Sequence, residues 1–224
     1  MEKHTVSASL TDNTKYMNRA LPVKKSFDII ERNLIIGGQN SAFYFIDGFT
    51  KDETMLKLMD SFLNISADDM PEDATSFSTS CIPYVEVDIL GDFDSIFKNL
   101  LSGVTCLFID GYEAAIAIDC RTYPSRSIEE PDKDKSLRGS RDGFVETIVF
   151  NTALMRRRIR DPHLIMEMYE AGTSTRTDVA LCYMSDRVDR ELLTTIQNKL
   201  EESKSQDLKM SQQSLAESLF QRKW

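Results

Sequence analysis

Residues 129–164, EEPDKDKSLRGSRDGFVETIVFNTALMRRRIRDPHL, form the stretch that decides how this chain is organised. The stretch opens with acidic and basic residues around a proline, passes through a glycine-containing turn, and ends in apolar residues at helical spacing. A charged opening of this kind is typical of a link between two folding units. We therefore expect two α/β subdomains, residues 1–125 and 126–224, and a long helix over about 141–160.

The entry into this helix is unusual, because two glycines and a possible N-cap serine lead directly into it. Backbone N–H groups at such an entry could hold an anion. We favour a carboxylate of the protein itself, from Glu129 or Asp132, as that anion. The candidate interdomain or ligand-binding loop consists of Glu130, Asp132, Arg138, Gly139, Ser140, Arg141, Asp142 and Gly143.

Four arginines close the predicted helix, and they form the candidate interface: Arg156, Arg157, Arg158 and Arg160. Three interpretations stay open. Cations at a helix C-terminus are stabilised by the helix dipole, by roughly 0.3–1 kcal/mol each. The arginines could instead form ion pairs with the acidic link and so brace the two subdomains. They could also face anionic lipid or a neighbouring subunit.

Outward from this stretch, apolar periodicity and turn residues predict the remaining elements. Strands are expected at 28–37, 42–46, 83–90, 104–109, 114–118, 164–169 and 178–184, and helices at 10–20, 50–64, 92–101 and 186–202. Residues 65–80 are acidic and rich in Ser and Thr, which predicts a loop. Gly37-Gly38 lies between two strands and lacks the rest of a phosphate-binding motif, so we expect a hairpin turn there. The fold class is α/β with α+β tendencies, in which mixed sheets are flanked by helices.

Composition argues against several classes of function. The chain has 224 residues and a formal net charge of −9, which disfavours nucleic acid as a partner. Its two histidines and four cysteines lack the spacing of a metal site or a catalytic set, so we expect no metal, no cofactor and no enzyme. No run reaches about 18 apolar residues, so we expect the chain as given to be soluble.

Several segments of the deciding stretch resemble the signature of the GerA family of spore-germination proteins, which includes germinant receptor A subunits and stage V sporulation protein AF. These segments are Glu130-Pro131-Asp132, Arg138 to Glu146, Asn151-Thr152-Ala153-Leu154 and Arg156 to Asp161. The resemblance implies a hydrophilic N-terminal domain with two α/β subdomains, similar to the substrate-binding proteins of transporters. In the family, several membrane-spanning helices follow this domain.

The resemblance also implies a function and a location. We expect a regulatory or assembly domain of a spore inner-membrane protein, on the cytoplasmic side, that acts in germinant signalling and ion release. The alternative is a domain that binds a small-molecule germinant between its subdomains. Expected partners are further copies of the same protein and other germination membrane proteins, such as receptor B and C subunits. Contact with an anionic membrane surface is a further possible interaction.

Overall fold

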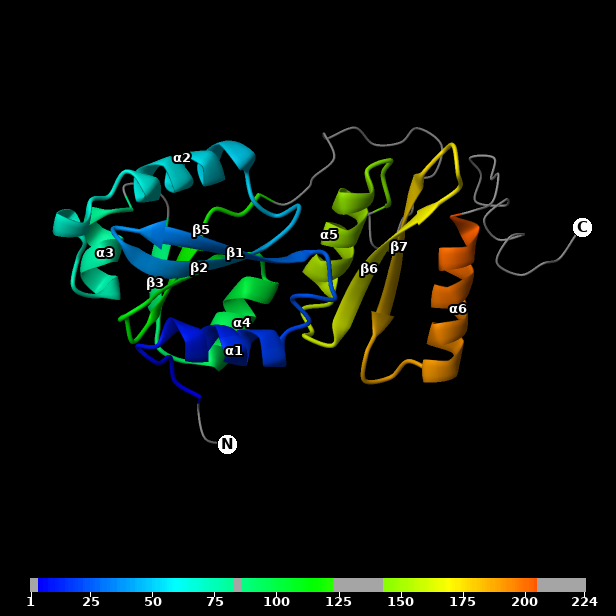
Figure 1. Cartoon of the computed structure of the whole chain (residues 1–224), viewed down its shortest axis with the longest axis horizontal. Coiled ribbons are helices and arrows are strands. Elements are labelled where there is room, and N and C mark those ends of the chain that lie inside the picture. Colours follow the sequence, from blue (N-terminus) through cyan, green and yellow to red (C-terminus); the bar gives the residue numbers. More distant parts are fainter. Residues whose placement is uncertain (1–3, 83–85, 123–142, 205–224) are drawn as a thin grey trace, which may run out of the picture. The chain divides into compact units, whose positions relative to one another are not determined.

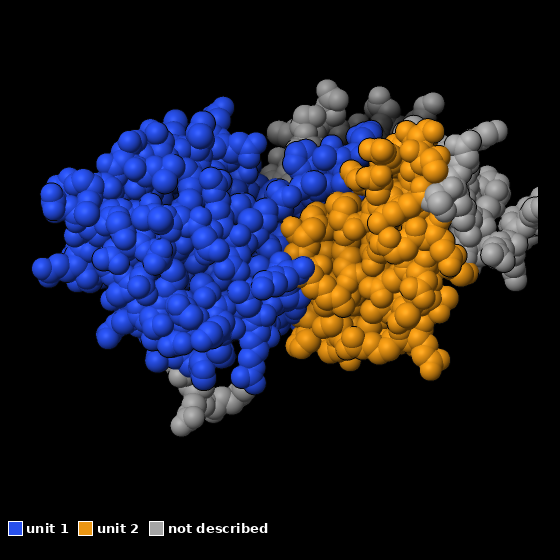
Figure 2. Space-filling view, viewed as in Figure 1, with its two compact units in different colours: residues 1–24, 28–162 blue, residues 25–27, 163–224 orange. Residues whose placement is uncertain are grey.

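The computed structural model describes residues 4–82, 86–122 and 143–204, which fall into two compact units (Figures 1 and 2). Among the described residues, the first unit comprises 4–24, 28–82, 86–122 and 143–162. The second comprises 25–27 and 163–204. This grouping differs from the division expected near residue 125, because the arginine-bearing helix belongs to the first unit. None of the described helices is long and apolar enough to cross a membrane.

The first unit is built on a five-stranded sheet of order β1-β2-β4-β5-β3. Its strands are β1 (Ile29–Ile36), β2 (Gln39–Ile46), β3 (Glu86–Leu90), β4 (Thr105–Ile109) and β5 (Ala115–Asp119). We expected mixed sheets, but every pairing within the described residues is antiparallel. Short turns impose this direction on the β1–β2 and β4–β5 pairs, since parallel strands need a long crossover.

Helices cover both faces of this sheet (Figure 1). Helices α1 (Leu10–Ala20) and α4 (Phe93–Leu101) pack on one face, and α2 (Asp52–Leu63) and α3 (Ala74–Ser80) on the other. The side chains of β2 alternate between the layers, with Tyr44 in the core beside α1 and α4 and Phe43 in the core beside α2. The central strand β4 is buried at all of its positions, which suits its mostly apolar sequence.

Residues 65–80 are a correction to the sequence analysis, because they form a short 3-10 turn, η1 (Ala67–Asp69), and helix α3 instead of a loop. Asp73 begins α3 by accepting a hydrogen bond from the Ser76 backbone N–H at 2.7 Å. Ala74 and Phe77, three positions apart, bury one face of the helix. The polar composition reflects the exposed face, and two buried residues are too few to reveal a helical period.

Helix α5 spans Ile148–Arg158 and is shorter than the helix expected over 141–160. Its N-cap is Thr147, which makes no capping side-chain hydrogen bond; the expected cap, Ser140, lies outside the described residues. The segment before the helix is held by Asn151, whose side chain accepts from the Val145 N–H and donates to the Val145 carbonyl, both at 2.7 Å. These two bonds fix the segment before the helix against the first turn of α5.

The second unit is a hairpin covered by one helix. Strands β6 (Leu164–Ala171) and β7 (Thr177–Met184) pair antiparallel, and α6 (Arg190–Ser203) packs on them, as the sequence predicted. Residues 25–27 run alongside β6: the Phe27 N–H donates to the Met166 carbonyl, and the Met166 N–H donates to Ser26 Oγ, both at 2.9 Å. These two bonds tie the segment to the edge of β6, while the sheet itself has two strands.

Candidate functional site

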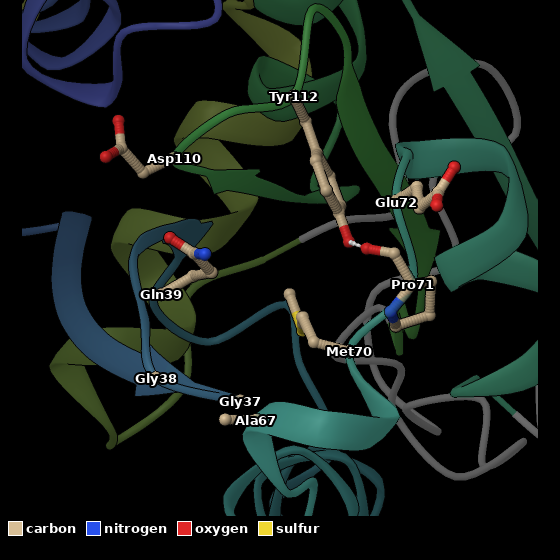
Figure 3. Close-up of a pocket in the computed structure, with 9 residues that line it drawn as sticks. All are labelled: Gly37, Gly38, Gln39, Ala67, Met70, Pro71, Glu72, Asp110 and Tyr112. Carbon is tan, nitrogen blue, oxygen red and sulfur yellow. Dashed lines mark hydrogen bonds between the residues drawn. The ribbon is translucent and has the colours of Figure 1, made fainter.

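The described part of the first unit contains a pocket of about 410 Å³ at the tip of the β1–β2 hairpin (Figure 3). Gly37 and Gly38 form the two-residue turn with φ angles of +53° and +78°, which glycine adopts without strain. A Cβ on Gly37 would lie 2.7 Å from Met70 Sδ, so the turn approaches the segment after η1 closely. The pocket is lined by Gly37, Gly38, Gln39, Ala67, Met70, Pro71, Glu72, Asp110 and Tyr112.

The lining of this pocket is acidic and apolar, with no Lys, Arg or His among its residues. The Tyr112 hydroxyl donates to the Pro71 carbonyl, and Met70 lies between Tyr112 and the glycine turn (Figure 3). The carboxylates of Asp110 and Glu72 lie on either side of Tyr112 in the same view. A pocket that offers carboxylates and carbonyls suits a hydrogen-bond donor or a cation, and it disfavours a phosphate group.

A buried ion pair joins α5 to the start of β1. The Arg156 guanidinium donates from Nε to Asp28 Oδ2 at 2.7 Å and from Nη2 to Asp28 Oδ1 at 3.2 Å. Both side chains are buried, with relative exposures of 0% and 1%. Arg156 Nη1 also donates to the Asp161 carbonyl at 3.0 Å. A bidentate pair with a further carbonyl partner satisfies the buried charges and defines the geometry closely.

The position of this ion pair along the chain is informative. Asp28 is the first residue after the segment 25–27, which belongs to the second unit. Asp161 lies two residues before His163, where the chain enters the second unit again. Arg156 therefore holds the first unit's chain at both of these crossing points.

Helix α5 also packs closely on the loop after β2. Gly48 has a φ angle of +81°, and a Cβ there would lie 3.1 Å from the Ala153 Cβ and 3.3 Å from the Val149 carbonyl oxygen. Ala153 is fully buried in the core that includes Tyr44 and Phe49. The glycine thus permits both the turn and the close approach of the helix.

Replacing Gly48 by alanine is expected to destabilise the first unit by about 1–3 kcal/mol, because the substitution strains the backbone and pushes α5 away. Gly111→Ala is the matched control. Gly111 also has a positive φ, +92°, but nothing lies within 4 Å of a Cβ there. Urea unfolding monitored by circular dichroism measures both variants. Equal losses in the two would show that backbone strain alone, and not helix docking, sets the cost.

The structure places only part of the predicted loop and interface. Gly143 is exposed ahead of α5, whereas Glu130, Asp132, Arg138, Gly139, Ser140, Arg141 and Asp142 lie outside the described residues. The interdomain or ligand-binding role of that loop therefore stays a prediction. Among the four arginines, Arg157, Arg158 and Arg160 are exposed. Arg156 differs, because it forms the buried pair with Asp28.

The second unit holds a polar network around Glu167, whose side chain is 12% exposed. Its carboxylate accepts from the Tyr169 hydroxyl at 2.7 Å, the Tyr183 hydroxyl at 2.8 Å and Gln197 Nε2 at 2.6 Å. The Lys25 ammonium lies 3.4 Å away and over the Tyr183 ring. Burial alone would raise the pKa of Glu167, but these donors and the ammonium together hold it below its usual value.

Asp28 and Glu167 were not among the residues singled out in the sequence. Asp28 directly precedes an apolar strand, and no other sequence pattern indicates that its side chain is buried or paired. For Glu167 the sequence gives a weak signal of a buried carboxylate, because this residue stands between Ile165 and Tyr169 on one face of a strand. A charged residue on an otherwise apolar face predicts a buried partner. Within the described residues, no three His, Cys, Asp or Glu side chains are grouped to hold a metal ion.

Comparison with known proteins places these features in a family. Stage V sporulation protein AF of Bacillus subtilis is 32% identical over 200 residues, a match that covers 89% of this chain and 41% of that protein. Spore germination protein KA of Bacillus subtilis is 29% identical over 200 residues, covering 88% of this chain and 36% of that protein. The chain thus spans about two-fifths of the length of these relatives.

A solved structure shares the fold. The N-terminal domain of the A subunit of the Bacillus megaterium spore germinant receptor GerK3 superposes with a TM-score of 0.68 at 20% sequence identity. The match covers 92% of this chain and 75% of that one. The model of the Bacillus/Clostridium GerA spore germination protein family matches residues 15–224. This chain therefore belongs to the GerA family of spore germination proteins.

Proposed function

We propose that this chain is the N-terminal regulatory or assembly domain of a GerA-family membrane protein, acting without catalysis in germinant signalling and ion release. The observation that carries the proposal is the family match over residues 15–224, in a chain that spans only about two-fifths of its curated relatives. The shared fold with the N-terminal domain of the GerK3 A subunit is consistent with this placement.

The described surface supports assembly as the task of this domain. Exposed apolar side chains occur at both ends of α5: Phe144 ahead of the helix is 68% and Phe150 in its first turn 44% exposed, and Ile159 beside the arginines is 39% exposed. Arginine and aromatic residues are enriched at protein interfaces relative to the rest of the surface. We therefore assign the arginine-bearing end of α5 to contacts with other copies or with other germination membrane proteins, such as receptor B and C subunits. The proposed setting is the cytoplasmic side of the spore inner membrane.

Spores test the proposal directly. Replacing both Arg157 and Arg158 by glutamate in the complete protein is expected to slow germination several-fold, because the charge reversal repels the contact that these residues make. The measurement is potassium release and loss of optical density after germinant addition, with protein levels compared by immunoblot.

A matched control uses Arg187→Glu with Arg190→Glu, which reverses two exposed arginines of the second unit. Those spores should germinate like the parent. An unchanged germination rate in the Arg157/Arg158 variant, at normal protein level and thermal stability, would contradict the proposal.

A further inference from the structure

We propose that one copy of this chain binds a second copy head to tail, with the arginine end of α5 seated on the acidic pocket at the β1–β2 tip of its neighbour. The inference rests on the assembly role proposed above and names the two surfaces that meet. The arginine end consists of Arg157, Arg158 and Arg160. The acidic tip consists of Asp68, Asp69, Glu72 and the pocket that includes Asp110.

Charge in this chain is strongly segregated, and the acidic tip lies within its most acidic region. Residues 58–97 contain no Lys, Arg or His but carry nine acidic residues, equal in size to the net charge of −9 for the whole chain. These are Asp60, Asp68, Asp69, Glu72, Asp73, Glu86, Asp88, Asp92 and Asp94. Asp68, Asp69 and Glu72 are exposed, and Leu63 at the nearby end of α2 is 60% exposed.

The arginine end has the complementary character. Arg157, Arg158 and Arg160 are exposed, and Ile159, which stands between Arg158 and Arg160, is 39% exposed. Arg160 donates from Nε to the Arg157 carbonyl at 3.3 Å, which ties it to the end of the helix. Cations and apolar groups at this end thus match the carboxylates, Leu63 and the pocket of the acidic tip.

The two surfaces lie too far apart to meet within one copy. The acidic tip adjoins the closed end of the β1–β2 hairpin, where Gly37 approaches Met70. Helix α5 packs at the open end of the same hairpin, where Gly48 meets Ala153. Figure 1 shows α3 and α5 at opposite sides of the first unit. Each strand has eight residues, so the ends are separated by about 23 Å at 3.3 Å per residue.

The pocket itself has the size and chemistry to admit a guanidinium group. Its volume of about 410 Å³ exceeds that of an arginine side chain, and its lining contains two carboxylates and no cation. The Tyr112 ring and Met70 supply an apolar wall of the kind that guanidinium groups pack against. Arginine also matches carboxylates in a bidentate geometry that lysine cannot reproduce.

A second copy fits these observations better than a lipid surface does. An anionic membrane would attract the arginine end but repel the acidic tip, and it would leave the pocket without a partner. A second copy satisfies both surfaces with one contact. Because the two surfaces differ, the contact is heterologous, and repeating it builds a ring if the rotation closes.

Sedimentation velocity of the 224-residue chain across a concentration series tests the inference. The parent chain is expected to self-associate and to do so less as salt rises, since exposed charges are screened. Variant one carries Arg157→Glu and Arg160→Glu, and variant two carries Asp69→Arg and Glu72→Arg. Each alone should self-associate at least about tenfold more weakly, a change of about 1.4 kcal/mol.

An equimolar mixture of the two variants tests directly whether the arginine end of one copy binds the acidic tip of another. Variant one retains an acidic tip and variant two retains an arginine end, so the mixture should associate more strongly than either variant does alone. Mixing would not restore association if the variants were unfolded. Circular dichroism of each variant checks that both are folded. Arg187→Glu with Arg190→Glu reverses the same number of charges in the second unit and should associate like the parent.

Three results would overturn the inference: a parent chain that stays monomeric, a mixture that stays monomeric, or binding to phosphatidylserine vesicles in place of self-association. The spore measurement separates this outcome from the proposed function. Slowed germination without head-to-tail association would leave the germination role standing and remove the interface. Head-to-tail association without any effect on germination would support the interface and contradict the proposed germination role.

Discussion

Replacing Arg156 by methionine is expected to destabilise the first unit by about 3–5 kcal/mol, because the substitution leaves the Asp28 carboxylate buried without its cation. Asp28 is 1% exposed and receives two hydrogen bonds from Arg156, and the Asp161 carbonyl loses a donor as well. Urea unfolding monitored by circular dichroism gives the loss. The matched control, Arg158→Met, removes an exposed arginine of the same helix and should change stability by no more than about 0.5 kcal/mol.

Two further variants separate the charge from the shape of this side chain. Arg156→Lys keeps the charge but cannot form the bidentate pair and reach the Asp161 carbonyl together, so it should also be clearly destabilised. Removing both charges with Arg156→Met and Asp28→Leu should cost less than the sum of the single changes, since no buried charge is then left alone. Additive losses, or a loss in Arg156→Met no larger than in Arg158→Met, would contradict the role assigned to the pair.

Hydrogen exchange would show where the Arg156 substitution acts. Arg156 holds the chain at Asp28 and at Asp161, on either side of the residues that belong to the second unit. We expect faster amide exchange at residues 28–30 and 159–162 in Arg156→Met, at denaturant concentrations too low to unfold the β2–β4 core. Uniform acceleration across the sheet would indicate a loss of global stability without a local anchor.

Replacing Glu167 by glutamine is expected to destabilise the second unit by about 2–3 kcal/mol, since hydrogen bonds to a charged acceptor contribute about 1.5–3 kcal/mol. The amide has one accepting oxygen where the carboxylate serves three side-chain donors, and it removes the charge beside Lys25. Hydrogen exchange of β6, β7 and α6 measures the loss. Glu170→Gln, on the same strand but with a side chain 49% exposed, should have little effect.

The pH dependence gives this second prediction a further test. The folded-state pKa of Glu167 lies below its usual value, so its charge stabilises the unit above the unfolded pKa of about 4.3. This contribution is lost as pH falls through the folded pKa. The stability difference between parent and Glu167→Gln should therefore be constant near neutral pH and narrow in acid. A difference that persists unchanged at about pH 3 would show that the charge is not its source.

The sequence predicted the local elements well where one strong pattern decided them. Apolar alternation and turn residues located the β1–β2 hairpin at Gly37-Gly38, the strands β4 and β5, and the helix over 10–20. The family was also recognisable, because Arg138 to Glu146 and Arg156 to Asp161 form a long and specific motif. Helix α3 was missed because only Ala74 and Phe77 of its seven residues are buried.

The sequence by itself thus determined most of the elements, the α/β class and the family, since these depend on short-range periodicity and on contiguous motifs. Only the tertiary structure decided which arginine of residues 129–164 is buried and which residue it binds. Arg156 bonds to Asp28, 128 residues away, while Arg157, Arg158 and Arg160 beside it stay exposed. The residues of such a run look alike in the sequence, and only the packing of α5 against the loop at Gly48 turns one of them inward. Residues 25–27 were equally hidden from sequence reasoning, because Ser26 is bonded to Met166 of β6, 140 residues further along the chain.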